Sequence, residues 1–197
     1  MRSYRHRAAA LVAVALLAGC SEKTSGSASA GSTGVNDTTS ATAQPSSSAK
    51  APVTRPKKID LKGVDSCSVL SDAQKQQFAL TGAPGNLPSP THPGATLCGI
   101  RSGDFSYGVG ITLITSEGIE MYDDAIQSGE AAPTRIGGFP AVVDKFTGAL
   151  PACFIGLDVA DGQLIDVQVD GSKLPMDELC SRATKIADAI IQTIIAK

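Results

Sequence analysis

The chain has no tryptophan and few other aromatic residues, three tyrosines and five phenylalanines among 197 residues. A hydrophobic core must therefore be built mainly from aliphatic side chains. Basic residues are not in excess either, since 17 Lys and Arg stand against 19 Asp and Glu. Because nucleic acids are bound by clustered Lys and Arg, this balance argues against a nucleic-acid partner.

Recognisable catalytic motifs are also missing, with no G-x-S-x-G, no H-E-x-x-H and no Walker-type glycine loop. The only histidine after the first 20 residues is His92, which we interpret as an exposed loop residue without a catalytic role. Four aspartates lack the spacing of a calcium loop and fit the solvated face of a hairpin better: Asp158, Asp161, Asp166 and Asp170. We expect no enzyme activity, no cofactor and no metal. A hydrolase that uses two carboxylates is the third interpretation, but no pair stands out.

Residues 1–19 have the features of a signal peptide. Three arginines precede an uncharged apolar run at 8–18, which at eleven residues is shorter than the roughly 20 residues of a membrane-spanning helix. The run ends in Leu17-Ala18-Gly19-Cys20, which resembles the bacterial lipobox. In that pathway a diacylglyceryl group is attached to the cysteine and the leader is removed before it. The alternative is an ordinary secretory signal in which Cys20 is incidental.

We therefore expect Cys20 to carry a lipid that anchors the mature chain on the extracytoplasmic face of the cell membrane, because two acyl chains hold a protein stably. Residues 20–58 are rich in Ser, Thr, Gly, Ala and Pro, which predicts a disordered tether with a span of roughly 35 Å. Lys50, Arg55, Lys57 and Lys58 are interpreted as its solvated end. A single globular domain is expected at 59–197.

Four cysteines lie in that domain: Cys67, Cys98, Cys153 and Cys180. An even number in an exported chain indicates two disulfides, and the lack of C-x-x-C spacing argues against a redox or zinc site. Three pairings are possible. We favour Cys67–Cys98 and Cys153–Cys180, because each would join a predicted helix to a nearby predicted strand, with roughly 3 to 4 kcal/mol of stabilisation apiece. A site with four thiolates around a metal is the alternative.

Hydrophobic periodicity predicts a mixed α+β domain. A capping box at 71–74 predicts a helix over 71–80, a loop follows at 82–93, and strands are predicted at 97–101 and 105–115, the second with Phe105 on its apolar face. A helix is expected over 117–127. Strands follow at 139–146, 153–159 and 164–169, the last two with Asp158 and Asp166 on the solvated side. The final segment has Leu179, Ala183, Ile186, Ile190 and Ile194 at helical spacing, so a long helix should cover the apolar face of an antiparallel sheet.

Several short motifs occur in a recognisable order. Asp65-Ser66-Cys67-Ser68-Val69-Leu70-Ser71-Asp72 precedes a short helix, a second cysteine opens a strand, and Gly137-Gly138-Phe139-Pro140-Ala141 forms a turn. Cys153 in an alternating strand and Cys180 in the final helix complete the order. The whole resembles the actinobacterial lipoprotein family called domain of unknown function 3558, although members usually have an aromatic residue where this chain has Gly99-Ile100. The resemblance implies a lipid-anchored domain similar to the Mog1/PsbP class, and no known reaction.

Two functions fit these features. The domain is either a non-catalytic envelope module that binds an unknown envelope protein or has a structural role, or a carrier of a small hydrophobic or lipid ligand. A carrier needs an aliphatic cavity of several hundred Å³, whereas an interaction module has a filled core and an exposed apolar patch. We favour the first, because core packing accounts for the isoleucine-rich stripe of the last helix.

Overall fold

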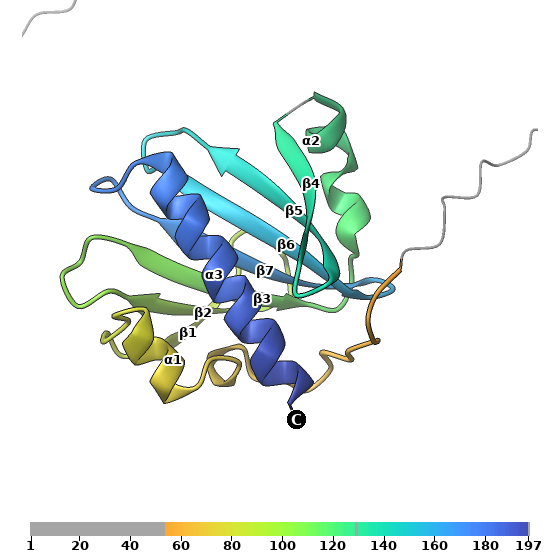
Figure 1. Cartoon of the computed structure of the whole chain (residues 1–197), viewed down its shortest axis with the longest axis horizontal. Coiled ribbons are helices and arrows are strands. Elements are labelled where there is room, and N and C mark those ends of the chain that lie inside the picture. Colours follow the sequence, from red (N-terminus) through yellow and green to blue (C-terminus); the bar gives the residue numbers. More distant parts are fainter. Residues whose placement is uncertain (1–53, 129, 197) are drawn as a thin grey trace, which may run out of the picture. The chain divides into compact units, whose positions relative to one another are not determined.

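The computed structural model of the chain describes residues 54–128 and 130–196. The predicted signal peptide and the predicted lipidation site at Cys20 lie outside these residues. The described part is built on one antiparallel sheet in the order β1-β2-β3-β7-β6-β5-β4 (Figure 1). Its strands are β1 (Gly85–Pro88), β2 (Thr96–Arg101), β3 (Gly108–Ile114), β4 (Ala131–Ile136), β5 (Phe139–Phe146), β6 (Ala152–Ala160) and β7 (Gln163–Asp170).

Five helical segments accompany the sheet: η1 (Ser66–Ser68), α1 (Asp72–Gln77), η2 (Ile119–Tyr122), α2 (Asp123–Ser128) and α3 (Met176–Ile195). The predicted α+β class, with a mainly antiparallel sheet and a long C-terminal helix, is confirmed. The predicted capping box is present as well, since Ser71 and Gln74 each bond the backbone of the other at the start of α1.

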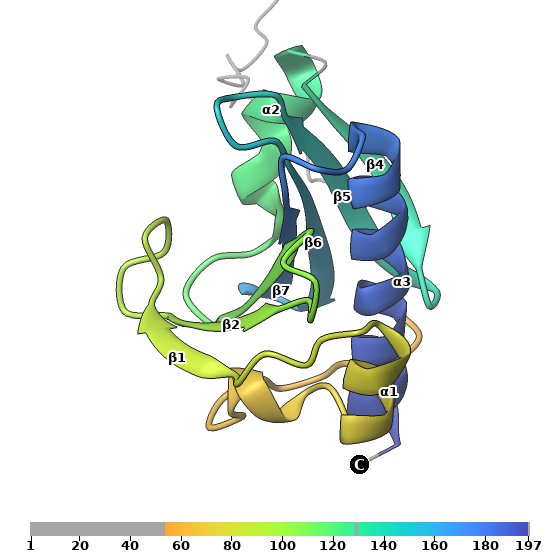
Figure 2. The same cartoon turned by 90° about the vertical axis from the view of Figure 1, so that its left-hand side faces the viewer.

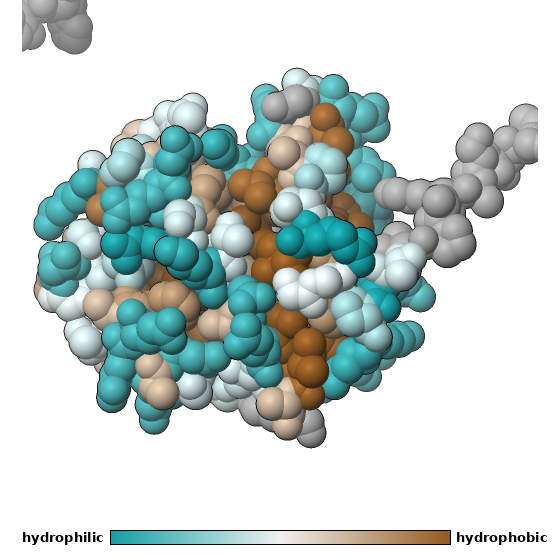
Figure 3. Space-filling view, in the orientation of Figure 1, coloured by the Kyte–Doolittle hydropathy of each residue, from teal (hydrophilic) through white to brown (hydrophobic). Residues whose placement is uncertain are grey.

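The helix α3 covers one face of the sheet and buries the stripe that the sequence predicts. Leu179, Ala183, Ile186 and Ile190 are fully buried there, and Ile194 nearly so. They pack on the apolar sheet residues that share this face, among them Ile100, Val109, Ile111, Ile155 and Val167. In Figure 3 the outer surface of α3 is mainly polar, and strongly apolar side chains gather in a band beside it. The core is therefore aliphatic, as the scarcity of aromatic residues requires.

The opposite face of the sheet is covered in part. Figure 2 shows α2 on the side away from α3, and η2 packs on β5 and β6. Tyr122 of η2 lies directly on Gly156 of β6, where a side chain would collide with its ring. Tyr122, which binds Asp166, and Arg55, which binds Asp158, explain why two predictions were wrong. Asp158 and Asp166, expected on a solvated face, are 1% and 6% exposed.

Three further predictions need correction. The predicted loop at 82–93 contains β1, which pairs with β2. The strand predicted from Phe105 begins at Gly108, because Phe105 adopts a φ of 54° in a turn and is largely exposed. His92 is buried, not exposed, because its loop folds back through bonds from His92 N to Ser89 Oγ and from Ala95 N to His92 O.

Two elements differ from prediction in extent. The helix expected over 117–127 is divided into η2 and α2, and α1 ends at Gln77 although its helix was expected to reach residue 80. The strand β4 was not anticipated. Its interior residues are exposed at the edge of the sheet and include Pro133, so it lacks the alternation by which strands are predicted.

The chain enters the domain at one end of the sheet, beside the β6–β7 turn and the C-terminal end of α3 (Figure 1). Arg55, predicted to be a solvated tether residue, instead binds Asp158 and Asp161. Lys57 donates to the carbonyl of Ile195. We call this the entry end. The loops 102–107 and 147–151 lie at the opposite, far end, because the strand residues beside them, Gly108 and Ala152, both pair with Asp170.

Candidate functional site

The half of the sheet formed by β1, β2 and β3 has no helix of the described residues over the face opposite α3 (Figure 2). Three glycines lie opposite one another in these strands, with Gly85 paired to Gly99 and Gly99 paired to Gly110. Glycine inside a strand costs about 0.5–1 kcal/mol relative to alanine and often marks a close approach of another backbone or a ligand. We call the surface over Gly85, Gly99 and Gly110 the open sheet face.

Apolar side chains border the glycines. Leu87 is 55% exposed and pairs with Leu97, whose Cδ1 covers Gly110. On the other side, Gln168 separates Gly110 from the half-buried Phe154 in the same cross-strand row. A cleft of about 310 Å³ lies over the glycines, with Arg101 and Asp170 at its far end. The solvated face of an antiparallel sheet normally has polar side chains at every second residue of each strand. On this face, glycine and leucine occupy several of those positions.

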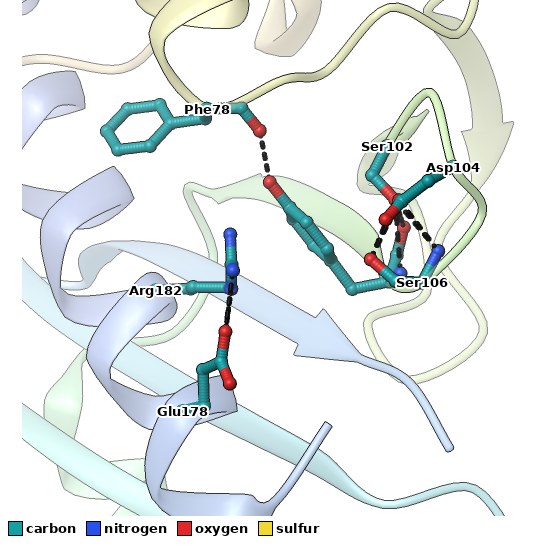
Figure 4. Close-up of polar contacts among 7 residues, drawn as sticks. Phe78, Ser102, Asp104, Ser106, Glu178 and Arg182 are labelled. Atoms are coloured by element: carbon teal, nitrogen blue, oxygen red, sulfur yellow. Dashed lines mark hydrogen bonds and ion pairs between the residues drawn. The ribbon is translucent and has the colours of Figure 1, made fainter. Parts of the chain in front are cut away.

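A polar cluster at the far end joins three elements (Figure 4). The Arg182 guanidinium lies 4.6 Å from the centre of the Tyr107 ring and binds Glu178 Oε1. The Tyr107 hydroxyl donates to the carbonyl of Phe78. Burial raises the pKa of Tyr107, although Arg182 opposes the shift. Because these polar groups are already paired, the cluster fastens the end of α1 to the sheet and α3, and it offers no group for chemistry.

The turn next to this cluster is held by Asp104. Its carboxylate accepts bonds from Ser102 Oγ, Ser106 Oγ and Ser106 N (Figure 4). The bond from the Ser106 hydroxyl, with those from the Ser106 amide and the Ser102 hydroxyl, lowers the pKa of Asp104 to about 2. This turn replaces the strand start that the sequence predicts at Phe105.

Beneath η2 lies a buried acid. Tyr122 donates its hydroxyl to Asp166 Oδ1 at 3.3 Å. Burial raises the pKa of Asp166 to about 7, and the Tyr122 bond lowers it only in part. Burial also raises the pKa of Tyr122. A carboxyl that ionises near neutrality is suited to acid–base chemistry, but this one is closed off by the Tyr122 ring, so we assign it a structural role.

The four domain cysteines form the two disulfides that we favoured. Cys67 is bonded to Cys98 and Cys153 to Cys180, with S–S distances of 1.99 and 2.04 Å. The first joins η1 to β2, and the second joins α3 to β6. The alternative of four thiolates around a metal is thereby excluded, since each sulfur is bonded to another. Among residues 54–128 and 130–196, no group of three or more His, Cys, Asp or Glu side chains is arranged to hold a metal ion.

The other predicted features do not converge on one site. His92 lies in the loop between β1 and β2, and burial lowers its pKa despite the nearby Glu117. Asp158 and Asp161 bind Arg55 at the entry end, whereas Asp166 binds Tyr122. No helix in the described part of the chain has the length and apolar character needed to cross a membrane.

The sequence interpretation missed the open sheet face, although a signal was there. Leu97, Gly99 and Arg101 alternate along β2, and Gly108, Gly110 and Thr112 alternate along β3. Such spacing places small residues on one face of adjoining strands. From the sequence we predicted only the apolar face of the strand at 105–115 and drew no inference from Gly108 and Gly110.

An α+β domain with two disulfides, a filled aliphatic core and one partly uncovered sheet face is thus the class of protein that the structure defines. The chain belongs to the family described as "Protein of unknown function (DUF3558)", which matches residues 15–193. No curated protein matches the chain, and no solved structure does. The likeness to the Mog1/PsbP class therefore stays a prediction.

Proposed function

We propose that this protein is an actinobacterial cell-envelope lipoprotein, anchored in the membrane through a lipid on Cys20, whose folded domain binds a partner protein without catalysing a reaction. The open sheet face is the binding surface. The leader at 1–19 is removed, and the segment from Cys20 onward connects the lipid to the domain.

Export is supported by the two disulfides, because such bonds persist in oxidising compartments outside the cytoplasm. The lipobox-like order at Leu17–Cys20 supports the anchor. Arg55 ties the first described segment to the β6–β7 turn, so the tether leaves from the entry end. Along β6, nine residues at about 3.3 Å each separate this end from the far end by roughly 30 Å.

The observation that carries the binding function is the cross-strand row Gly85, Gly99 and Gly110, in which Gly85 and Gly99 have open space above them and Leu97 covers Gly110. A partner that presents apolar side chains can approach the bare backbone closely and bury Leu87 and Leu97. Burial of apolar area stabilises a contact by about 25 cal/mol per Å². The partner is a protein and not a nucleic acid, because basic side chains do not dominate this face.

A carrier function is the second candidate from sequence, and no specific observation among the described residues favours it. The space between α3 and the sheet is filled by aliphatic side chains, with Ile155, Val167 and Ile186 fully buried. The clefts on the described surface are partly open and border polar side chains, such as Arg101 and Asp170 on the open sheet face.

The anchor is tested by a Cys20→Ala variant. We expect the unaltered protein in the membrane fraction with the mass of a diacylated chain that starts at Cys20, and the variant without that lipid mass and released from the membrane. A Ser21→Ala variant is the control. Full retention of Cys20→Ala in the membrane would contradict the proposal.

The binding surface is tested by a photoreactive residue at position 87 in intact cells, which should form a discrete cross-link to one protein. Gly99→Tyr should abolish that cross-link, because a Cβ at this position meets no atom nearer than Gly85 O at 3.9 Å and the ring must extend over the open sheet face. Asp124→Tyr on α2 is the matched control and should leave it intact. Equal cross-linking in both variants would refute the surface.

A further inference from the structure

The helical segment η2–α2 covers a direct continuation of the open sheet face (Figure 2). One cross-strand row connects the two regions, since Leu97 pairs with Thr112, Thr112 with Asp166, Asp166 with Gly156, and Gly156 with Val142. The row begins at the half-buried Leu97 and ends beneath η2, where Asp166 is 6% and Val142 1% exposed. We call residues 119–128 the η2–α2 cover.

The η2–α2 cover is attached mainly through one side chain. Tyr122 is the buried residue of η2, and every residue of α2 is at least partly exposed. Tyr122 packs with Val142 and Ala131, and with the half-buried Ile119 and Ile126, in an apolar cluster separate from the main core. Segments with few buried apolar contacts open locally at a lower free energy than the core does. The η2–α2 cover can therefore leave the sheet without disrupting the packing of α3.

A carboxyl group lies beneath this attachment. Asp166 accepts a hydrogen bond from the Tyr122 hydroxyl at 3.3 Å, and the ring of Tyr122 closes it off from solvent. The charged group that faces it from β5 is another acid, Asp144, which is itself close to Glu130. The residues that pair with Asp166 on β3 and β6 are uncharged. No basic side chain of the described residues acts on this carboxyl, so its ionised form is better accommodated in water than under the closed cover.

We propose that the η2–α2 cover is a pH-dependent lid, which opens as Asp166 releases its proton to solvent and uncovers the part of the sheet face formed by β5, β6 and β7. Opening adds Gly156 and Val142 to the row that starts at Leu97. Control of partner binding through this larger surface rests on the proposed function, whereas the opening itself does not.

The direction of the pH dependence follows from burial. In the closed state burial raises the pKa of Asp166 to about 7, and in the open state the hydrated carboxyl returns to its ordinary value near 3.8. The closed state therefore holds the proton more tightly, and closure is most favoured below pH 3.8. The ratio of open to closed molecules rises by up to about tenfold per pH unit until about pH 7 and is constant above it.

Hydrogen–deuterium exchange of the full chain at several pH values tests the lid, with each rate divided by the intrinsic rate of the unprotected amide at that pH. The protection factors of amides in 119–128 should fall on the order of a hundredfold between pH 5 and 8. At each pH they should be at least about tenfold below those of β3 and β7, because the cover opens without unfolding of the sheet. No partner is present, so the result does not depend on the proposed binding function.

An Asp166→Asn variant should lose most of this pH dependence, since its amide accepts the Tyr122 bond and does not ionise. Asp124→Asn, which neutralises an exposed acid on α2, is the matched control and should behave as the unaltered protein does. The proposal is overturned if protection in 119–128 of the unaltered protein is independent of pH, or if it equals the protection of β7, which would mean opening only by unfolding of the whole domain. An equal fall in Asp166→Asn and Asp124→Asn would also overturn it.

Discussion

Arg55 and Asp158, which are 103 positions apart in the sequence, form a bidentate ion pair, with Nε 2.9 Å from Oδ1 and Nη2 3.0 Å from Oδ2. The pair is nearly closed off from solvent, since Asp158 is 1% exposed. It fixes the last part of the predicted tether to β6, next to the bond from Ile59 N to Val159 O.

Loss of Arg55 should therefore destabilise the domain. An Arg55→Ala variant leaves the Asp158 carboxylate buried without its counter-charge, and removal of one partner of such a pair costs about 3 kcal/mol. Urea unfolding measures the change. The control is Asp161→Ala, which removes the second, 84% exposed partner of Arg55 and should cost less than about 0.5 kcal/mol. Equal losses in the two variants would contradict a specific role for the buried pair.

The burial of Asp166 beneath Tyr122 predicts an unusual dependence of stability on pH. Because burial raises the pKa of Asp166 from 3.8 to about 7, the folded state holds this proton more tightly than the unfolded chain does. The associated stability is complete below pH 3.8 and is lost as pH rises through about 7. Within this window each pH unit removes up to about 1.4 kcal/mol.

An Asp166→Asn variant should lack this decline, since an amide still accepts the Tyr122 bond but does not ionise. We expect it to be less sensitive to pH than the unaltered protein between pH 5 and 8, as urea unfolding over that range reports. The nearby Asp144 has a pKa that burial also raises and remains in both proteins, so only the difference between them is diagnostic. Parallel pH profiles would refute the assignment. Asp124→Asn serves as the surface control.

These two acids show where inference from the sequence stops. Alternation along β6 and β7 correctly placed Ile155 and Val167 on one face of the sheet and Asp158 and Asp166 on the other. It did not reveal what covers the second face, because η2 and Arg55 come from distant segments. A pattern of period two identifies two faces of a strand, but burial of each face depends on tertiary packing.

Short sequence segments predicted local structure better than they predicted the burial of these two acids. The capping box at Ser71 and Gln74, the final amphipathic helix and the disulfide pairing were all predicted from short segments and are present. The edge strands β1 and β4 were not predicted, because their side chains are mostly exposed and their prolines, Pro88 and Pro133, suggest loops. The open sheet face also depends on β1, so the alternation along β2 and β3 alone was not enough to predict it.

The Cys153–Cys180 disulfide should stabilise the attachment of α3 to the sheet. It spans 27 residues, for which the chain-entropy model gives about 3 to 4 kcal/mol. We expect the double variant Cys153→Ala, Cys180→Ala to lose about this amount in urea unfolding under oxidising conditions. Under reducing conditions, where both disulfides open, the variant and the unaltered protein should differ by much less. A similar difference under both conditions would show that packing of the sulfurs, not the covalent bond, is responsible.

Two glycines on the same face of the sheet should respond oppositely to alanine. A Cβ at Gly156 would meet the Tyr122 ring well inside van der Waals contact, so Gly156→Ala should displace η2 and cost about 1–3 kcal/mol. At Gly99 the nearest atom is 3.9 Å away, and alanine there should be neutral or stabilise by up to about 1 kcal/mol, since it restricts the unfolded chain. Thermal unfolding of both variants makes the comparison. Equal destabilisation would mean that the face over Gly99 is occupied within the domain, and the open sheet face would then not be available to a partner.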